Sequence, residues 1–392
     1  MTGSERQSTV RQSPGQPSPG QPSTGQPSTG QPSTGQPSLP PVRLAPESDS
    51  SAQWLPELRT IAARALDCAG GIEPALALAI RLGQELPYPM EGRTLQLWES
   101  LATVGACNLS VGRSIEPHLD AVSILHQARQ QSGSEELEQL ATAGNSCWGV
   151  FAAEGKDQHL RAHRQGNGWM LTGTKPWCSL AGRLSHAIVT ARTDDGRRAF
   201  AVNLKDPGVS VIATGWVALG LPEVSSGPIS FEHVPAVPVG APGWYFARPG
   251  FAWGGAGVAA LWFGAATAVA RRVYAHCAGR EPDQIALLQL GLVDGHLTAA
   301  RNALALAARQ ADSDRHTAGA SLPAARARAA VVRASESILE LAGHAMGPEP
   351  LAFDADHAAR VADLTVYLRQ DHAERSIASI GQQLLAPGRL PW

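Results

Sequence analysis

Three side chains that could do chemistry lie in the stretch Gly166–Arg192. It reads GNGWMLTGTKPWCSLAGRLSHAIVTAR, and Lys175, Trp177 and Ser179 offer a cation, a large aromatic ring and a hydroxyl within five residues. Gly-Asn-Gly is a turn signal, the following run alternates with a period of two, and a second extended run covers 186–190. The spacing predicts a hairpin-like pair of strands joined by a small loop, with the three side chains at the end of the first strand.

A second stretch, near the C-terminus, offers carboxylates. Asp363, Tyr367 and Asp371 recur at every fourth position, and Glu374 follows. A carboxylate that reaches a substrate can act as a general base. A run of mixed charge such as Arg369–Arg375 is, however, usually the solvated face of a helix. The residues alone leave both interpretations of Asp371 open.

Two further titratable residues, Glu116 and His118, stand at the beginning of a helix predicted over 114–132. Polar residues at a helix start are usually caps or surface groups. We therefore expect neither of them to take part in a reaction.

Size, charge and composition limit the classes of protein. With 392 residues the chain is long enough for two or three domains. Its net charge of -2 provides no basic excess for nucleic-acid binding. Five scattered cysteines without a CxxC motif indicate reduced thiols in a cytoplasmic protein, with no disulfide framework and no metal site. The first residues show no secretory signal pattern.

Four regions differ in pattern. Residues 1–48 repeat a Ser-Pro/Thr-Gly-Gln-Pro unit without apolar positions, which predicts a disordered arm. Residues 51–145 carry apolar residues at helical spacing, 146–240 contain short extended runs separated by turn residues, and 246–386 return to long helical periods. The predicted fold class is α+β: an N-terminal helical domain, a middle β-barrel-like domain and a C-terminal four-helix bundle. The expected strands are 148–152, 159–163, 169–172, 187–192, 198–203, 209–212 and 229–231, and the expected C-terminal helices are 258–273, 285–311, 324–345 and 361–385.

The charge-free stretch Gly250–Ala270 is long enough to cross a bilayer. Much of it is Ala and Gly, which insert into membranes more weakly than Leu or Ile. We therefore expect a buried helix of a soluble protein and no membrane partner.

The first stretch resembles the middle-domain signature of the acyl-CoA dehydrogenase family. The matching residues are Gly168, Trp169, Leu171, Gly173, Lys175, Trp177 and Ser179. The order of helices, strands and helices over about 54–385 is similar to the same family. The resemblance implies FAD as the cofactor, with Trp177 covering the flavin ring and Ser179 bonded near its N5.

The resemblance implies further cofactor contacts. The positions concerned are Val150, Ala152, Ala153, Trp177, Ser179, Arg280, Gln289 and Gly343. Ala153 lacks the hydroxyl that the family has there, but main-chain groups could still serve the ring. Arg280 and Gln289 correspond to residues that reach the FAD pyrophosphate from a neighbouring subunit, and a guanidinium suits a phosphate.

The resemblance also implies a base. Aligned through Asp363 and Tyr367, the base is Asp371, one methylene shorter than the Glu of the family, with Glu374 as the alternative. Other branches place the base at the start of the charge-free helix, where this chain has Trp253-Gly254-Gly255 and no carboxylate.

The implied activity is α,β-dehydrogenation of an acyl thioester such as acyl-CoA, with hydride transfer to flavin N5. The implied partners are an electron-transferring flavoprotein as electron acceptor and further copies of the chain in a homodimer or homotetramer. Two alternatives stay open. One is a flavin oxidase or monooxygenase of the same fold, and the other is a non-catalytic paralogue that assembles with an active one.

Overall fold

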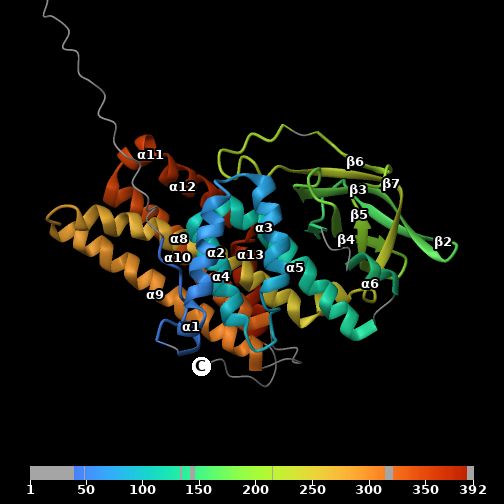
Figure 1. The fold of residues 1–392 in the computed structure, drawn as a ribbon, viewed down its shortest axis with the longest axis horizontal. Helices are drawn as coiled ribbons and strands as arrows, with labels where there is room; N and C mark the ends of the chain where they lie inside the picture. The colour runs from blue at the N-terminus through green and yellow to red at the C-terminus, as the bar shows by residue number, and fades with distance from the viewer. Residues whose placement is uncertain are drawn as a thin grey trace, which may run out of the picture. The chain divides into compact units, whose positions relative to one another are not determined.

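The computed structural model describes residues 39–47, 49–132, 135–141, 146–213, 215–313 and 321–385. The arm predicted over 1–48 lies outside these residues, apart from 39–47. The predicted domain boundaries stay a prediction, whereas the predicted order of helices, strands and helices is confirmed (Figure 1).

The N-terminal region is helical. Its elements are α1 Asp49–Gln53, α2 Leu55–Asp67, α3 Ile72–Glu85, α4 Thr94–Cys107, α5 Leu109–Ser132 and α6 Glu135–Ala141. Asn108 separates α4 from α5, and its side-chain oxygen accepts a hydrogen bond of 3.0 Å from Val111 N. This is the bond that an N-cap residue makes to the first turn of a helix. The cap starts α5 five residues earlier than predicted, so Glu116 and His118 lie in its interior.

The described middle region consists of one sheet. Its strands are β1 Trp148–Phe151, β2 Leu160–Gln165, β3 Gly168–Ser179, β4 His186–Thr193, β5 Gly196–Asn203, β6 Val209–Val211 and β7 Ser226–Val239. The strand order is β1-β4-β2-β3-β7-β5, with β6 beside β7 and an additional pairing of β4 with β5. That additional pairing closes the sheet on itself, in agreement with the predicted barrel-like domain.

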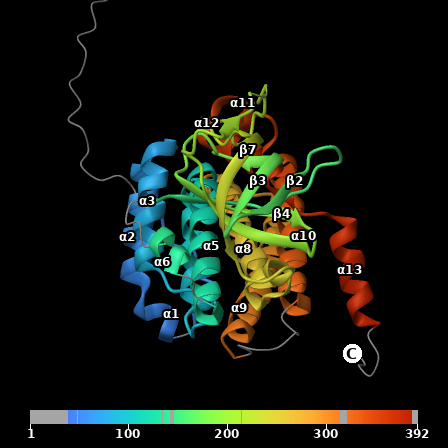
Figure 2. The same ribbon diagram turned by 90° about the vertical axis from the view of Figure 1, so that its right-hand side faces the viewer.

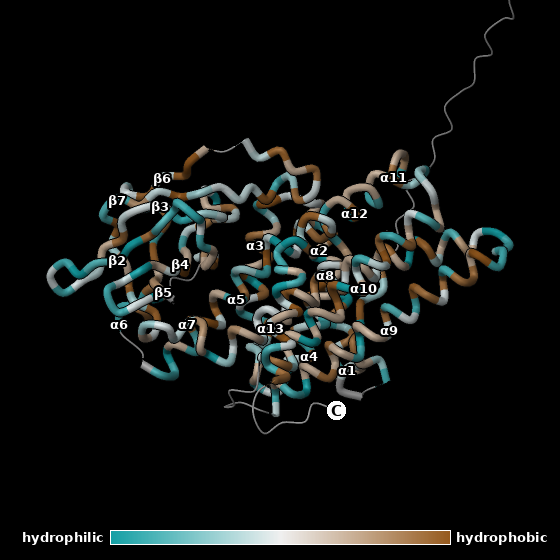
Figure 3. The backbone as a smooth tube through the Cα atoms, turned by 180° about the vertical axis from the view of Figure 1, so that it is seen from behind, coloured by the Kyte–Doolittle hydropathy of each residue, from teal (hydrophilic) through white to brown (hydrophobic). Residues whose placement is uncertain are grey.

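The expected hairpin between the two halves of Gly166–Arg192 is wrong. β3 pairs with β2 and β7, whereas β4 pairs with β1, β5 and one residue of β2. The hairpin is instead β2–β3, because Gly166 has a φ of 58° and so suits the first position of a two-residue turn. This turn is hydrophilic (Figure 3). The turn signal in Gly-Asn-Gly was therefore correct, but it joins the preceding strand.

The C-terminal region is helical again. Its elements are α7 Trp244–Ala247, α8 Pro249–Ala278, α9 Gln284–Ser313, α10 Ser321–Met346, α11 Glu349–Phe353, α12 Ala355–Tyr367, the 3-10 turn η2 Leu368–Gln370, and α13 Glu374–Leu384. The helix predicted over 361–385 is thus interrupted after Tyr367. No residue of α13 is buried; α13 lies at the edge of the helical region in Figure 2 and contacts α10, where Ser321 Oγ donates to Gln383 Oε1 at 2.7 Å.

Helix α8 is the buried helix expected from the charge-free stretch. Its length and composition would permit a membrane span, but 72% of its most apolar window is buried inside the protein. Glycine lets α4 and α8 touch: a Cβ added to Gly264 would lie 1.9 Å from Ala102 O, and one added to Gly105 would lie 2.4 Å from Leu261 O. Because α5 follows α4 directly, this contact also fixes α5 beside α8.

Candidate functional site

Trp177 lies on a bulge of β3. The register of β3 with β7 shifts between Lys175 and Cys178, and Trp177 has a φ of 58°. Bulges of this kind redirect a side chain away from the strand. The indole is 64% exposed, which is unusual for so large an aromatic ring. The bulge therefore presents a flat aromatic surface to a ligand or a second chain.

Lys175 holds the segment after β1 in place. Its Nζ is buried and donates to Glu154 Oε1 at 3.0 Å, Thr190 O at 2.7 Å and Thr190 Oγ1 at 2.9 Å. Burial lowers the pKa of Lys175, and the pairing with Glu154 opposes that shift. The Ala152 carbonyl is also fixed, because it accepts from Arg197 Nη2 at 3.0 Å. The signature lysine thus has a structural role, and it positions Ala152 and Ala153 near β3.

Ser179 lies at the end of β3 and faces α5. Its hydroxyl accepts from Arg113 Nη2 at 2.8 Å and lies 2.7 Å from Ser226 Oγ. The gap between this part of β3, β1 and α5 has a volume of about 10 Å³, and Val150 is among the residues that line it. That is room for one water molecule at most. A flavin ring does not fit inside this gap and would have to lie outside it, on the exposed face of Trp177.

A row of charged residues on α5 continues from Arg113. Glu116 and Asp120 follow at the spacing of one helix face. Glu116 Oε2 lies 3.6 Å from Arg113 Nη1 and accepts from the Tyr367 hydroxyl at 3.4 Å. Burial raises the pKa of Glu116 to about 7, although Arg113 opposes the shift. This carboxyl group can therefore gain or lose a proton near neutral pH.

The glycines at the start of α8 leave room for side chains from other helices. A Cβ added to Gly254 would lie 3.1 Å from Asp120 Oδ1, and Arg328 Nη1 donates to Gly255 O at 2.9 Å. Asp120 itself lies 3.6 Å from Arg248. The sequence has no carboxylate in this part of α8, but the structure places Asp120 of α5 there, and Arg328 of α10 beside it.

Asp371 lies after η2 and is already bonded through both oxygens. Oδ1 accepts from Arg328 Nε at 2.9 Å and from Ser376 Oγ at 3.3 Å, and Oδ2 accepts from Ala373 N at 2.8 Å. Asp371 therefore forms an ion pair with Arg328. Its role as a base stays a prediction, as does that of Glu374, which begins α13.

The expectation that Glu116 and His118 are caps or surface groups is wrong for both. His118 is buried, and its Nδ1 accepts from Trp148 N at 3.2 Å. Burial lowers the pKa of His118 to about 4, so the ring is neutral and joins α5 to β1. Glu116 contacts Tyr367 and Arg113, and the cap interpretation overlooked that α5 begins earlier and places this side chain against other elements.

The structure does not bring Arg280 and Gln289 to Trp177 within one chain. Arg280 is exposed and follows α8, roughly 30 Å along the helix from Leu261, which packs on α5. In Figures 1 and 3 the turn between α8 and α9 lies at the end of the helical region farthest from the strands. Gly343 is in α10, and a Cβ added there would meet nothing within 4 Å in the described chain. Any contact of these residues with a ring at Trp177 therefore needs a second copy.

The middle region of the chain is similar in sequence to a known protein family. Residues 153–234 match the acyl-CoA dehydrogenase middle domain. The acyl-CoA dehydrogenase FadE27 of Mycobacterium tuberculosis is 31% identical over 116 residues, which cover 26% of this chain and 29% of that protein.

Two solved structures share the fold over most of its length. KijD3, in complex with FMN and dTDP-3-amino-2,3,6-trideoxy-4-keto-3-methyl-D-glucose, is similar with a TM-score of 0.70 and 20% identity, over 86% of this chain and 93% of that one. Glutaryl-CoA dehydrogenase of Mycobacterium smegmatis, in complex with FADH2, has a TM-score of 0.66 and 19% identity, over 85% and 96%.

Proposed function

We propose that the chain, whose residues 153–234 match the acyl-CoA dehydrogenase middle domain, is a flavin-dependent oxidoreductase of that family and acts on a small, polar substrate. The observation that carries this proposal is the row Arg113, Glu116 and Asp120, which begins at the Ser179 hydroxyl. Charged groups are costly to bury against a hydrocarbon chain. They favour a substrate with its own charged or hydrogen-bonding groups.

The residues around the bulge fit a flavin ring. Trp177 offers an exposed aromatic face, Ser179 a hydroxyl, and Ala152 and Ala153 main-chain groups held by the Lys175 network. KijD3 and glutaryl-CoA dehydrogenase, which share the fold, are described with FMN and FADH2 respectively. A bound flavin would accept two electrons from the substrate. We propose FAD, because Arg280, Gln289 and Gly343 of a second copy would hold its pyrophosphate and adenosine.

Glu116 is the better-placed group to take a proton. It is separated from Ser179 only by Arg113, and its carboxyl group titrates near neutral pH. A general base works best when its pKa is near the working pH. Asp371 is the competing candidate, but its oxygens would first have to leave Arg328 and Ala373.

The first candidate reaction is α,β-dehydrogenation of a short, polar acyl thioester, with an electron-transferring flavoprotein as the electron acceptor. The match to FadE27 and to the middle domain supports it. The second candidate is an oxidase or monooxygenase that uses oxygen. The charged row on α5 supports it, and KijD3, which shares the fold, is in complex with FMN and a nucleotide-linked amino sugar.

An anaerobic reduction experiment separates these candidates. Acyl-CoA thioesters of equal length, with and without a terminal carboxylate or hydroxyl, are mixed with the flavin-loaded protein, and bleaching of the flavin absorbance is followed. We expect the polar thioester to be faster by about tenfold, the effect of one charge-assisted hydrogen bond.

Faster bleaching by the plain acyl chain would contradict the polar-substrate proposal. Bleaching by neither thioester, together with rapid oxygen consumption by the chemically reduced protein and an amino sugar nucleotide, would favour the oxygen-using candidate. A protein that binds flavin but is inert in both assays would be the non-catalytic paralogue.

A further inference from the structure

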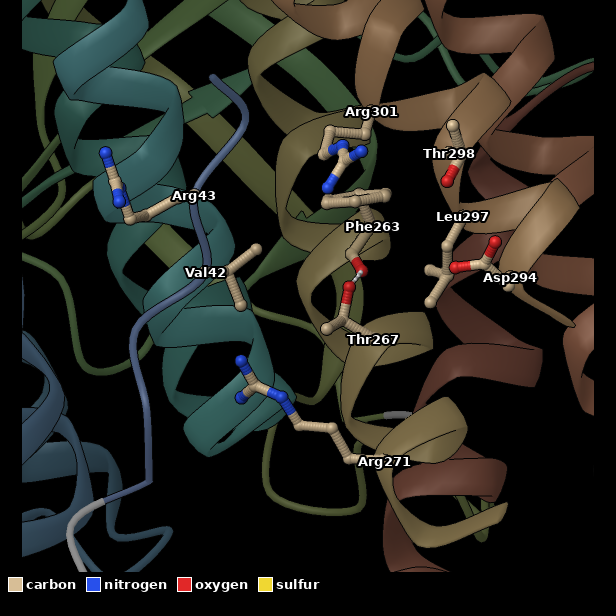
Figure 4. Close-up of a pocket in the computed structure, with 9 residues that line it drawn as sticks. All are labelled: Val42, Arg43, Phe263, Thr267, Arg271, Asp294, Leu297, Thr298 and Arg301. Carbon is tan, nitrogen blue, oxygen red and sulfur yellow. Dashed lines mark hydrogen bonds between the residues drawn. The ribbon is translucent and has the colours of Figure 1, made fainter. Parts of the chain in front are cut away.

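A second cavity lies between the segment 39–47, α8 and α9 (Figure 4). Its volume is about 210 Å³, and Val42 and Arg43 line it together with residues of 263–271 and 294–301. It shares no residue with the Ser179 site. The wall formed by 39–47 comes from a part of the chain that plays no role in the proposed reaction.

This wall is fixed to the helices by a buried carboxylate. Glu99 of α4 has no exposed surface, and its Oε1 accepts from Leu44 N at 2.7 Å and from Ala45 N at 3.2 Å. Val42 N donates to Thr103 Oγ1 at 3.0 Å. Because a charged acceptor strengthens such bonds, the segment is an integral part of the fold and the cavity keeps its shape.

None of the three arginines that line the cavity forms an ion pair among the described residues, and two of them, Arg271 and Arg301, are also left with unused hydrogen-bonding capacity. Arg271 Nη2 donates to Pro41 O at 3.2 Å, but its Nη1 is buried without a hydrogen-bond partner in the described chain. Arg43, in contrast, is bonded to Ser51 Oγ and Pro46 O.

The two arginines with unused donors point into the cavity, whereas Arg43 points away from it. In Figure 4 the Arg301 guanidinium projects from α9 towards Phe263, and that of Arg271 projects from α8 towards the segment at Val42. Arg43 turns to the other side of the segment. Two cationic donor groups therefore face the cavity, and a buried donor without a partner is costly unless a ligand satisfies it.

We propose that this cavity binds a small oxyanion, a phosphate ester or a carboxylate, between Arg271 and Arg301. Guanidinium groups match the geometry of both anions. Phe263 and Leu297 form an apolar part of the lining that suits a short carbon skeleton. Asp294 is the single carboxylate among the residues that line the cavity, so it repels the anion and limits its affinity.

Binding would fasten the segment 39–47 to the helices. Arg271 already holds Pro41 O, and an anion between Arg271 and Arg301 would link that contact to α9. A ligand that binds only the folded chain raises its stability by mass action.

The test is calorimetric titration of the full chain with inorganic phosphate, glycerol phosphate and succinate, at constant ionic strength set with chloride. We expect saturable binding of at least one of them at a single site, and the tightest ligand shows whether the site prefers phosphate or carboxylate. Arg301→Gln should weaken that binding about tenfold, the loss of one charge-assisted hydrogen bond. Asp294→Asn should strengthen binding, which a purely structural role of Asp294 would not do.

The matched control is Arg309→Gln, an exposed arginine on the same helix, which should leave the affinity unchanged. Arg301 is preferred to Arg271 for the test because Arg271 also bonds to Pro41. The proposal is overturned if none of the three anions shows saturable binding up to ~10 mM. It is equally overturned if Arg309→Gln weakens binding as much as Arg301→Gln, because attraction to the basic surface would then explain the effect.

Discussion

Replacing Glu116 with glutamine should slow substrate-driven flavin reduction by ~100-fold, the lower end of the contribution of a general base. In the wild type the rate should rise with pH through about 7, because the carboxyl group must lose its proton before it can accept one from the substrate. Glu116→Gln should make the profile flat in this range. Stopped-flow reduction at a series of pH values measures both effects.

Glu116→Gln should also change how the free energy of unfolding depends on pH, in a direction that the pKa shift fixes. The pKa of Glu116 is about 7 in the folded protein, above the ordinary value of 4.5, so the folded state binds more protons than the unfolded state between these values. Wild-type stability should therefore fall as the pH rises from about 4.5 to about 7, by at most ~3 kcal/mol. The fall should be smaller in Glu116→Gln.

Asp371→Asn and Glu374→Gln are the controls for this prediction. Asp371→Asn should lower the melting temperature, because it leaves Arg328 without its ionic partner, but it should keep the pH profile. If instead Asp371→Asn or Glu374→Gln flattens the profile and Glu116→Gln does not, the base lies in the C-terminal stretch, and Glu116 only supports the structure.

Charging the exposed apolar face of α9 should produce a monomer that has lost FAD. Leu288 and Leu292 are 57% and 45% exposed and lie one turn apart on α9, and Ile285, one turn before Leu288, is also exposed. A contiguous apolar surface of this kind marks an interface between chains. We expect the double variant Leu288→Asp, Leu292→Asp to dissociate in light scattering.

The loss of FAD follows from the position of Arg280. Because Arg280 and Gln289 lie at and after the turn between α8 and α9, with Arg280 roughly 30 Å along the helix from Leu261 at the α5 contact, we expect that a monomer cannot use them on its own flavin. The affinity for FAD should fall by ~100-fold, the loss of two hydrogen bonds to charged groups. FMN, which lacks the adenosine half, should be affected much less.

Leu306→Asp is the matched control, since Leu306 is 51% exposed on the same helix but far from Arg280. A double variant that stays oligomeric would show that this face is not the interface. A monomer that keeps the wild-type affinity for FAD would show that one chain holds the whole cofactor.

Local patterns in the sequence were sufficient to predict where the helices and strands lie and to recognise the family signature that forms β3. Period-two runs and turn residues located all the described strands, but β3 extends past its predicted end at 172 to Ser179, and β7 extends past its predicted end at 231 to Val239. The pairing of β3 with β7 rather than β4 could not be read in this way. Which strands pair depends on contacts between residues far apart in the sequence. The spacing of apolar residues within one strand does not identify its partner.

The charged row on α5 shows that the candidate site also depends on contacts between residues far apart in the sequence. Glu116 stands 251 residues before Tyr367 in the chain, yet the two side chains meet. The glycines Gly254 and Gly255 indicated only an absent carboxylate, and the structure was needed to show that Asp120 and Arg328 occupy that space. Likewise, the position of Asp371 in the sequence gave no sign of its ion pair with Arg328.

The most direct test of the account is the affinity of the purified full chain for FAD, measured by quenching of flavin fluorescence, in the wild type and in Trp177→Ala. The account predicts one FAD per chain and a loss of affinity of about tenfold in Trp177→Ala, because the exposed indole is the surface on which the ring stacks. Absence of FAD binding, or equal affinity in the two proteins, would contradict the claim that the bulge of β3 holds a flavin.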